Sequence, residues 1–227
     1  MIDRESFEES LIRPLQYWCK KSQSEVKSLL GSAVAQMVGF DQNNPHHCYD
    51  LFSHSLHTVQ YLDKDSPALL RVSAFFHDVG KPFVAKEKQG HLVFYGHAQK
   101  SSEIAEPLLD ELGYNTSEKE LICFFINHHD DFISWVLSSE QYNHDNPYLI
   151  EISKENLVAH IRKTVNRQEF NVIQNTYELW DNLLSLCLAD ASAQAEYIHK
   201  NGIIVDSKEH KITKLKLMRE LLSSAFT

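Results

Sequence analysis

The sequence has few cysteines, glycines and prolines, and these shortages exclude several classes of protein. Its four cysteines lie far apart, without a C-x-x-C pair, at Cys19, Cys48, Cys123 and Cys187. Such spacing argues against a disulfide framework and a thiolate zinc site, and the reducing cytosol is the expected compartment. Seven Gly and six Pro among 227 residues leave little room for the many turns of a β-sandwich or barrel. The composition therefore favours helices.

Long apolar segments and an excess of positive charge are also missing. The chain starts MIDRESFEES, without the apolar stretch of a signal peptide, and no apolar run reaches about 18 residues. We therefore expect a cytoplasmic protein that does not bind or span a membrane. A formal net charge of -9 argues against extended nucleic-acid binding, which needs many cations against the phosphates. A small phosphorylated substrate is compatible with this charge, because a bound metal would reverse its sign locally.

Apolar residues recur at helical spacing through most of the chain. They predict helices over residues 6–20 with a break at Pro14, 24–38, 51–61, 69–79, 97–112, 117–128, 176–200 and 207–225. Asp50 is expected to cap one of these helices, and Gly80 to end another in the left-handed conformation. Residues 82–96 are typical of a short hairpin, whereas 130–175 are ambiguous apart from a turn at 145–147.

The sequence shows no repeat and no convincing linker between domains. We therefore expect one domain over residues 1–227 with a core at about 41–200. The N-terminal helices 6–38 and the C-terminal helix 207–225 would be extensions of this core.

A dispersed set of histidines and aspartates could share a metal ion. His77 and Asp78 are adjacent at a predicted helix end, His54 lies within the preceding helix and Asp190 within a later one. Imidazole and carboxylate suit a borderline divalent cation, and four ligands from three helices can enclose one ion inside a bundle. The alternative for these four residues is a buried polar network without metal.

Two further histidines could add a second ion. His97 is expected at a helix start and His129 at a helix end, and the carboxylate of Asp78 would bridge the two ions. A metal pair of this kind can bind phosphate and make hydroxide from water at neutral pH. Alternatively, His97 and His129 are capping or surface histidines.

Several linked segments carry a family resemblance. In chain order they are NPHHCYDLFSHSLHTV, LLRVSAFFHDVGKP, GHLVFYGHAQKSSEIAEPLL, ICFFINHHD and LCLADASAQ. In this order they resemble HD-domain phosphohydrolases over about residues 41–196, most of all the HD domain of bacterial CCA-adding enzymes. The resemblance implies an all-α HD-type helical bundle with a small β-hairpin near the metal site. The nucleotidyltransferase part of those enzymes has no counterpart here, because Gly31-Ser32 is not followed by paired acids.

The resemblance also implies roles for individual residues. The metal ligands would be His54, His77, Asp78, His97, His129 and Asp190, and the catalytic residues Asp78 and Lys81. Lys81 would stabilise charge on the phosphate, although it could equally be a solvated lysine at a helix end.

Other residues near these positions have open assignments. His47 is expected near the site, as a substrate-binding residue rather than a ligand. His128 competes with its neighbour His129, which we favour because it fits the family pattern. Asp130 and Asp131 are expected to be solvated acids after a helix.

These features predict a metal-dependent phosphohydrolase that uses metal-activated water. Its substrate would be a small phosphorylated molecule, a nucleotide phosphomonoester or 2′,3′-cyclic phosphodiester, or an RNA end. It would hold one or two divalent ions, with Mn, Fe, Co, Ni, Mg and Zn not distinguished. Two rivals are a di-iron HD-type oxygenase and a non-catalytic module that binds a nucleotide or is stabilised by a metal. The sequence does not indicate an oligomeric state.

Overall fold

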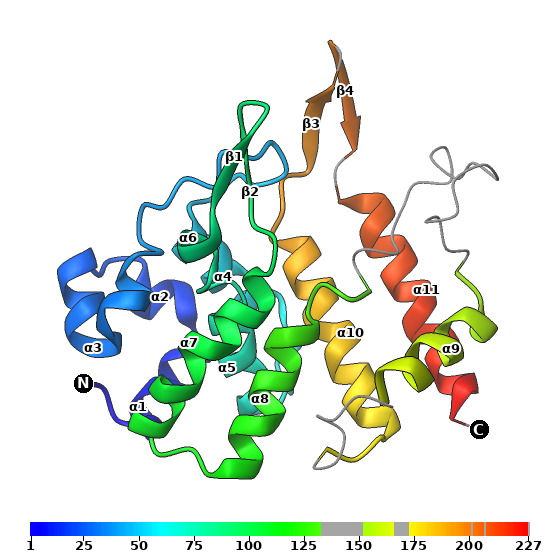
Figure 1. The fold of residues 1–227 in the computed structure, drawn as a ribbon, viewed down its shortest axis with the longest axis horizontal. Helices are drawn as coiled ribbons and strands as arrows, with labels where there is room; N and C mark the ends of the chain where they lie inside the picture. The colour runs from blue at the N-terminus through cyan, green and yellow to red at the C-terminus, as the bar shows by residue number, and fades with distance from the viewer. Residues whose placement is uncertain (133–151, 166–172, 201, 207, 227) are drawn as a thin grey trace.

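The computed structural model is an all-α bundle that carries two short antiparallel hairpins (Figure 1). It describes residues 1–132, 152–165, 173–200, 202–206 and 208–226. Its helices are α1 (Arg4–Ser10), α2 (Pro14–Trp18), α3 (Gln23–Ala35), α4 (Leu51–Tyr61), α5 (Ala68–Phe76), α6 (Lys81–Val84), α7 (His97–Glu111), α8 (Thr116–His128), α9 (Lys154–Val165), α10 (Tyr177–Ser192) and α11 (Glu209–Ala225). Its strands are β1 (Lys86–Lys88), β2 (His91–Val93), β3 (Tyr197–Lys200) and β4 (Ile203–Asp206).

Five helices, α1, α3, α4, α8 and α10, begin at a side chain that caps them. The Asp50 carboxylate accepts a hydrogen bond from the backbone N–H of Ser53 at 2.7 Å, so its predicted capping of α4 is confirmed. Capping boxes open α3 at Ser22 and α8 at Asn115. These caps satisfy backbone donors that would otherwise remain unpaired at the helix starts.

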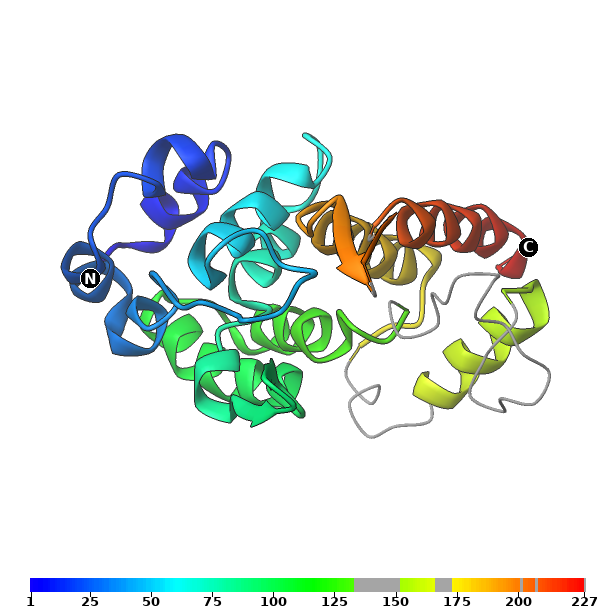
Figure 2. The ribbon, with the colours of Figure 1, turned by 90° about the horizontal axis from the view of Figure 1, so that it is seen from above.

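An apolar core joins the N-terminal helices to the bundle. Phe7 of α1 packs edge-on against Phe75 of α5 with ring centroids 5.4 Å apart, and Trp18 of α2 lies beside both Phe52 and Phe75. Viewed from above, α1 to α3 lie at one end of the molecule, with α9 and α11 at the other (Figure 2). Within the described residues, no helix is both long and apolar enough to cross a membrane.

The hairpin predicted within residues 82–96 is present, but residues 82–84 belong to a helix. Strand β1 pairs with β2 in the register Lys86↔Val93, and the backbone turns through Gln89 and Gly90 at positive φ. The short helix α6 precedes it. The ambiguous region contains α9, and the turn expected at 145–147 lies outside the described residues.

The second hairpin corrects the prediction that one helix runs from 176 to 200. Helix α10 ends at Ser192, and Tyr197 of β3 pairs with Asp206 of β4. Aromatic and β-branched residues flank the dipeptide Asn-Gly at 201–202, a strong hairpin signal in sequence. The apolar pattern of α10 does not continue past Ser192, and β-propensity with turn chemistry decides the structure there.

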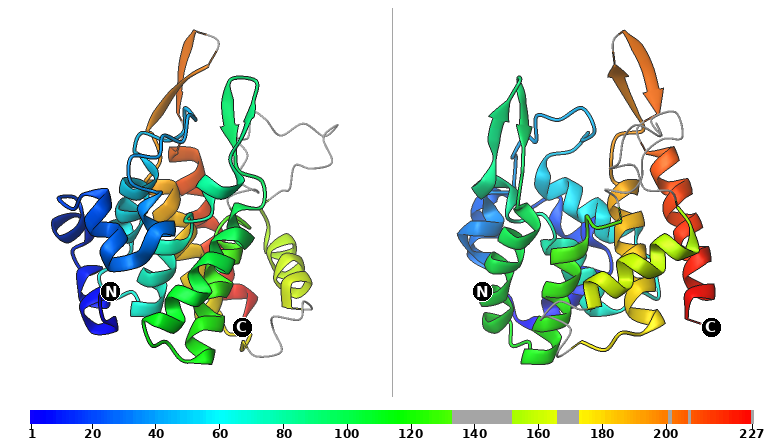
Figure 3. Two further views of the ribbon diagram at one scale, coloured as in Figure 1. Left: turned by 60° about the vertical axis from the view of Figure 1, so that its left-hand side comes forward. Right: turned by 45° about the vertical axis from the view of Figure 1, so that its right-hand side comes forward.

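Both hairpins rise from the same end of the bundle, with the loop of residues 41–50 between them (Figure 3). The loop is tied to the first hairpin, because the Asn43 side chain donates a hydrogen bond to the Gly90 carbonyl at 3.2 Å. It is tied to the segment before β3, because the backbone N–H of Ala195 donates to the His46 carbonyl at 2.8 Å. We call the two hairpins and this loop the rim; the start of α7 and the ends of α8 and α10 lie beneath it (Figure 1).

Candidate metal centre

Helix ends beneath the rim bring the predicted imidazoles together. His54 lies in the first turn of α4, His77 caps the C-terminus of α5, His97 begins α7 and His129 caps the C-terminus of α8. Asp190 lies in the last turn of α10 rather than mid-helix, because that helix ends at Ser192. The His and Asp residues of the sequence analysis therefore reach one place from five helices.

A glycine lets two of these helices approach. A Cβ atom on Gly80 would lie 2.5 Å from the backbone N of Ser101 and 2.7 Å from the carbonyl O of His97. Gly80 has φ -79°, so the prediction of a left-handed helix stop was wrong. The glycine is needed because α7 packs directly on the end of α5. At this contact the backbone N–H of Gly80 donates a hydrogen bond to the Ser101 hydroxyl at 2.9 Å.

The main chain fixes the orientation of all four imidazole rings. Their Nδ1 atoms face carbonyl oxygens, which only accept hydrogen bonds, so each Nδ1 carries the proton. The pairs are His54 with Ala193 at 3.4 Å, His77 with Ala74 at 2.8 Å, His97 with Phe94 at 2.9 Å and His129 with Ile126 at 2.7 Å. In its neutral form each ring then presents the lone pair of Nε2 to the centre, the arrangement typical of metal-bound histidine.

Asp78 divides the centre into two groups of ligands. Its Oδ2 atom lies 3.1 Å from His77 Nε2 and 3.6 Å from His54 Nε2, while its Oδ1 atom lies 3.2 Å from His97 Nε2 and 3.7 Å from His129 Nε2. We call His54, His77 and Asp190 the inner group. His97 and His129 belong to the outer group, and Asp78 is placed to bridge the two.

The spacing of these atoms fits metal coordination. Two ligand atoms that are each about 2.1 Å from one ion lie about 3.0 Å apart at a right angle and about 3.4 Å apart at the tetrahedral angle. In the inner group, Asp190 Oδ1 is 2.9 Å from His54 Nε2 and 3.7 Å from His77 Nε2. In the outer group, the two Nε2 atoms of His97 and His129 are 3.1 Å apart.

The polar atoms of the centre also need a cation. His54 Nε2, His77 Nε2 and Asp78 Oδ1 are buried and have no hydrogen-bond partner among the described residues. Lone pairs of imidazole and carboxylate face one another there, at a cost that burial increases. A divalent ion would satisfy them, so the residues present fit a metal ion.

The pKa values of His77, Asp78 and Asp190 are shifted in a way that also favours a bound cation. Burial lowers the pKa of His77, but the carboxylates of Asp78 and Asp190 outweigh it and raise that pKa to about 10. Burial raises the pKa values of both carboxyls, yet the imidazoles around them hold both well below the usual range. The carboxylates are therefore ionised and attract a proton or a metal ion to the facing nitrogens.

Lys81 is buried in the centre, so it is not the solvated helix-end lysine of the alternative interpretation. Its Nζ atom lies 2.7 Å from Asp78 Oδ2 and donates a hydrogen bond to the side-chain oxygen of Gln42 at 2.9 Å. The ammonium also lies 5.3 Å from the centroid of the Phe94 ring. Gln42 is 1% exposed and was missed by the sequence analysis, since no motif or spacing marks it.

His47 lies next to the inner group without joining it. Its ring packs edge-on against His54 with centroids 5.1 Å apart, and its buried Nδ1 atom has no hydrogen-bond partner among the described residues. Burial, with the nearby Lys81 ammonium, lowers the pKa of His47 to about 2. The ring is therefore neutral at physiological pH.

The His-His-Asp-Asp segment at the end of α8 points in two directions. His128 turns away from the centre, with Nδ1 2.7 Å from Asp131 Oδ2, whereas His129 faces Asp78. Asp131 was expected to be solvated but is paired with His128. Asp130 was also expected to be solvated, yet its Oδ2 atom lies 3.2 Å from His97 Nε2 and its Oδ1 atom 3.5 Å from His129 Nε2. The signal for Asp130 in the sequence was only its position next to His129.

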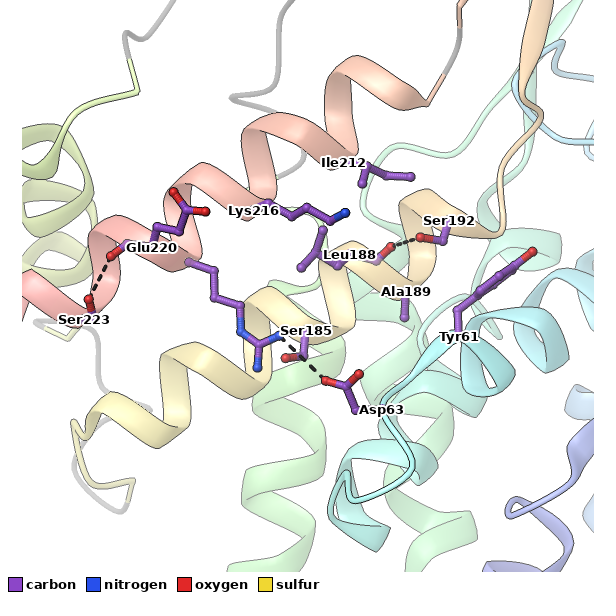
Figure 4. A pocket seen from close by; sticks show the side chains of 11 residues that line it. Tyr61, Asp63, Ser185, Leu188, Ala189, Ser192, Ile212, Lys216, Glu220 and Ser223 are labelled. Atoms are coloured by element: carbon purple, nitrogen blue, oxygen red, sulfur yellow. Dashed lines mark hydrogen bonds and ion pairs between the residues drawn. The ribbon is translucent and has the colours of Figure 1, made fainter.

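A groove of about 620 Å³ lies apart from these ligands, between α10, α11 and the end of α4 (Figure 4). Leu188, Ala189 and Ile212 contribute apolar walls, and Lys216 and Glu220 lie on its α11 side. None of the ligands described above lines it.

Comparisons with known proteins identify the family of the chain. The HD domain family matches residues 47–174, more than half of the chain. The match includes the motif residues from His54 to His129 and ends before Asp190. A CC-adding tRNA nucleotidyltransferase of Thermus thermophilus is 32% identical over 103 residues, which cover 43% of this chain and 24% of that protein. The chain thus spans about a quarter of this relative. It belongs to the HD domain family, whose members are generally metal-dependent phosphohydrolases.

Proposed function

We propose that the protein hydrolyses a phosphate ester of a nucleotide or of an RNA end, either a monoester or a 2′,3′-cyclic diester. The observation that carries the proposal is the convergence of four imidazole Nε2 atoms on the two oxygens of Asp78. Two cation positions that share one carboxylate are the ligand arrangement of two-metal hydrolases.

The side chains divide the work of holding metal. His54, His77, Asp190 and Asp78 Oδ2 would hold one ion, and His97, His129 and Asp78 Oδ1 the other. Bound metal would supply positive charge for nonbridging phosphate oxygens and lower the pKa of water to about 7. The protein contributes rings fixed by the main chain and buried carboxylates that keep their negative charge.

Lys81 is proposed to stabilise negative charge on the reacting phosphate. Its ammonium is held by Asp78, Gln42 and the face of Phe94, so it requires little reorganisation when charge develops. A buried lysine at the bridging carboxylate favours an anionic substrate. This observation supports phosphate chemistry over the dioxygen chemistry of a di-iron oxygenase.

His47 is proposed to contact the substrate as a neutral hydrogen-bonding group. Because its pKa is lowered to about 2, the ring is not an imidazolium that donates a proton as a general acid. Its Nδ1 atom is buried and has no hydrogen-bond partner among the described residues, so a hydroxyl or phosphate group of a bound nucleotide would reach it only if the ring turned.

The rim supports a nucleotide as the substrate class. Tyr95, after the first hairpin, is 71% exposed, and Tyr197, in the second, is 60% exposed. Exposed aromatic rings are stacking platforms for bases. The name of the Thermus relative, a tRNA nucleotidyltransferase, supports an RNA end as one form of the substrate.

The experiment is metal analysis of the purified protein, followed by assays for phosphatase and cyclic-phosphodiesterase activity with each metal added back. Asp78→Ala is expected to abolish bound metal and turnover while the far-ultraviolet circular dichroism stays helical. Asp110→Ala, at an exposed carboxylate paired with Lys119, is the control and should behave as the wild type.

Three results would contradict the proposal. Full activity of Asp78→Ala would show that the centre is not catalytic. Bound iron with oxygen uptake and no phosphate release would indicate the oxygenase. Nucleotide binding without turnover under every metal would indicate a non-catalytic module.

A further inference from the structure

We propose that Asp130 is the third protein ligand of the outer ion and that this ion, unlike the inner one, exchanges readily with the solvent. The proposal rests on the proposed function and adds to it a carboxylate that the family resemblance does not assign. It predicts a protein that binds one divalent ion firmly and whose second ion follows the concentration of free metal.

The geometry of Asp130 is that of a ligand. Each of its carboxylate oxygens faces a different imidazole, His97 at 3.2 Å and His129 at 3.5 Å. One ligand atom from each of the three residues lies within 4.8 Å of the other two. Asp78 Oδ1, buried and without a hydrogen-bond partner among the described residues, approaches the same two imidazoles.

A simple ion pair between Asp130 and a protonated histidine explains less of this geometry. Both rings already use Nδ1 as the donor to a carbonyl, so only the Nε2 atoms can respond to the carboxylates. Those two Nε2 atoms are 3.1 Å apart, and only one proton fits between them. A single metal ion satisfies both rings and both carboxylates at once.

Charge explains why the outer ion needs Asp130. Asp190 and one oxygen of Asp78 would bind the inner ion, and the Lys81 ammonium neutralises part of the negative charge of Asp78. Without Asp130 the outer ion would have two neutral rings and one oxygen of a carboxylate that is already compensated. The Asp130 carboxylate restores the balance of charge between the ions and their ligands.

Exposure explains why the outer ion exchanges. The inner side chains are at most 7% exposed, whereas His97 is 13% and Asp130 47% exposed. Water reaches the Asp130 carboxylate and competes for the ion, and it screens the attraction between the two charges. The same open side leaves coordination positions for a phosphate group.

The test is equilibrium dialysis of the full chain against Mn²⁺, with electron paramagnetic resonance of the bound ions. The wild type should bind two Mn²⁺ ions, one tightly and one more weakly, and show spin coupling between them. Asp130→Asn should weaken the second ion at least about tenfold and lose the coupling, while the first is unchanged. Asp131→Asn removes the same charge one residue away and should keep both ions, because its carboxylate faces His128.

The outcomes separate this proposal from the proposed function. If Asp130→Asn binds its second Mn²⁺ as tightly as the wild type does, or if the wild type binds only one, the outer-ligand proposal is overturned and metal-dependent hydrolysis stands. If the wild type binds no Mn²⁺ and no other divalent ion, both are overturned.

Discussion

The inner and outer groups of the centre use the same ligand types but rest on different parts of the fold. His54, His77 and Asp190 come from α4, α5 and α10, which pack against one another around the core. His97 and Asp130 lie beside a hairpin and a turn, and Gly80 is the point where α7 meets α5. The difference suggests that damage to the inner group removes the centre, whereas damage to the outer group changes how many ions it holds.

The largest contrast is expected between His54→Ala and His97→Ala. His54→Ala should lower the affinity for metal by more than about 100-fold. The variant loses a buried ligand, and the carboxylates of Asp78 and Asp190 lose the imidazole that faces them. His97→Ala should leave one ion bound at nearly the wild-type affinity. Metal stoichiometry after dialysis measures both, and equal losses in the two variants would mean that the groups are not separate sites.

Lys81→Met should separate catalysis from metal binding. Turnover is expected to fall about 10²- to 10³-fold, the usual cost of a group that stabilises charge in the transition state, while metal content stays the same. Lys86→Met, on the exposed first hairpin, is the matched control. Steady-state kinetics and metal analysis on the same samples measure turnover and metal content separately. Unchanged turnover in Lys81→Met would show that this residue has no role in catalysis.

Gly80→Ala tests the contact that places the outer group. The backbone conformation of Gly80 is open to alanine, but its Cβ would meet the Ser101 backbone at 2.5 Å, so α7 must shift. A loss of about 1–3 kcal/mol in the free energy of unfolding is expected, with preferential loss of the outer ion. Chemical denaturation and Mn²⁺ dialysis measure the two effects. Wild-type values for both would show that α7 adjusts freely.

The smallest effect is expected far from either group, at the start of α11. Asp206 accepts hydrogen bonds from the backbone N–H groups of Lys208, Glu209 and His210. Burial raises the pKa of Asp206, but the His210 side chain and these backbone groups outweigh it and lower the pKa to about 2. A folded pKa below the unfolded value of about 3.9 means that the stabilisation is present above about pH 4 and is lost as pH falls through about 2.

Asp206→Asn should therefore cost about 1 kcal/mol at pH 6, as the loss of a helix cap does, and less as the pH approaches 2. Urea unfolding at pH 6 and pH 3 measures the difference between the variant and the wild type. A cost that does not depend on pH would contradict the assignment, and metal binding at pH 6 should not change.

Sequence patterns predicted the helical elements well where apolar spacing was strong and a cap was explicit, as at Asp50 before α4. They overran at α10, because the hairpin signal at 197–206 was weighed less than helical periodicity. The imidazoles and carboxylates were placed by their motifs, and the structure brings all of them together. The roles of Asp130 and Gln42 could not be predicted from the sequence. Asp130 follows a helix end and Gln42 lies in a loop, and only the folded chain shows where such side chains point. The need for glycine at position 80 also comes from tertiary structure, because the contact that it permits joins Gly80 to Ser101, 21 positions away.

Backbone carbonyl groups, rather than side chains, orient the four imidazole rings of the centre. Because each ring is oriented by a peptide oxygen of Ala193, Ala74, Phe94 or Ile126, its tautomer does not depend on the identity of the side chain at that position. Evolution or design can therefore change the surroundings of this centre, and its preference among ions or substrates, while the peptide backbone continues to aim the imidazoles.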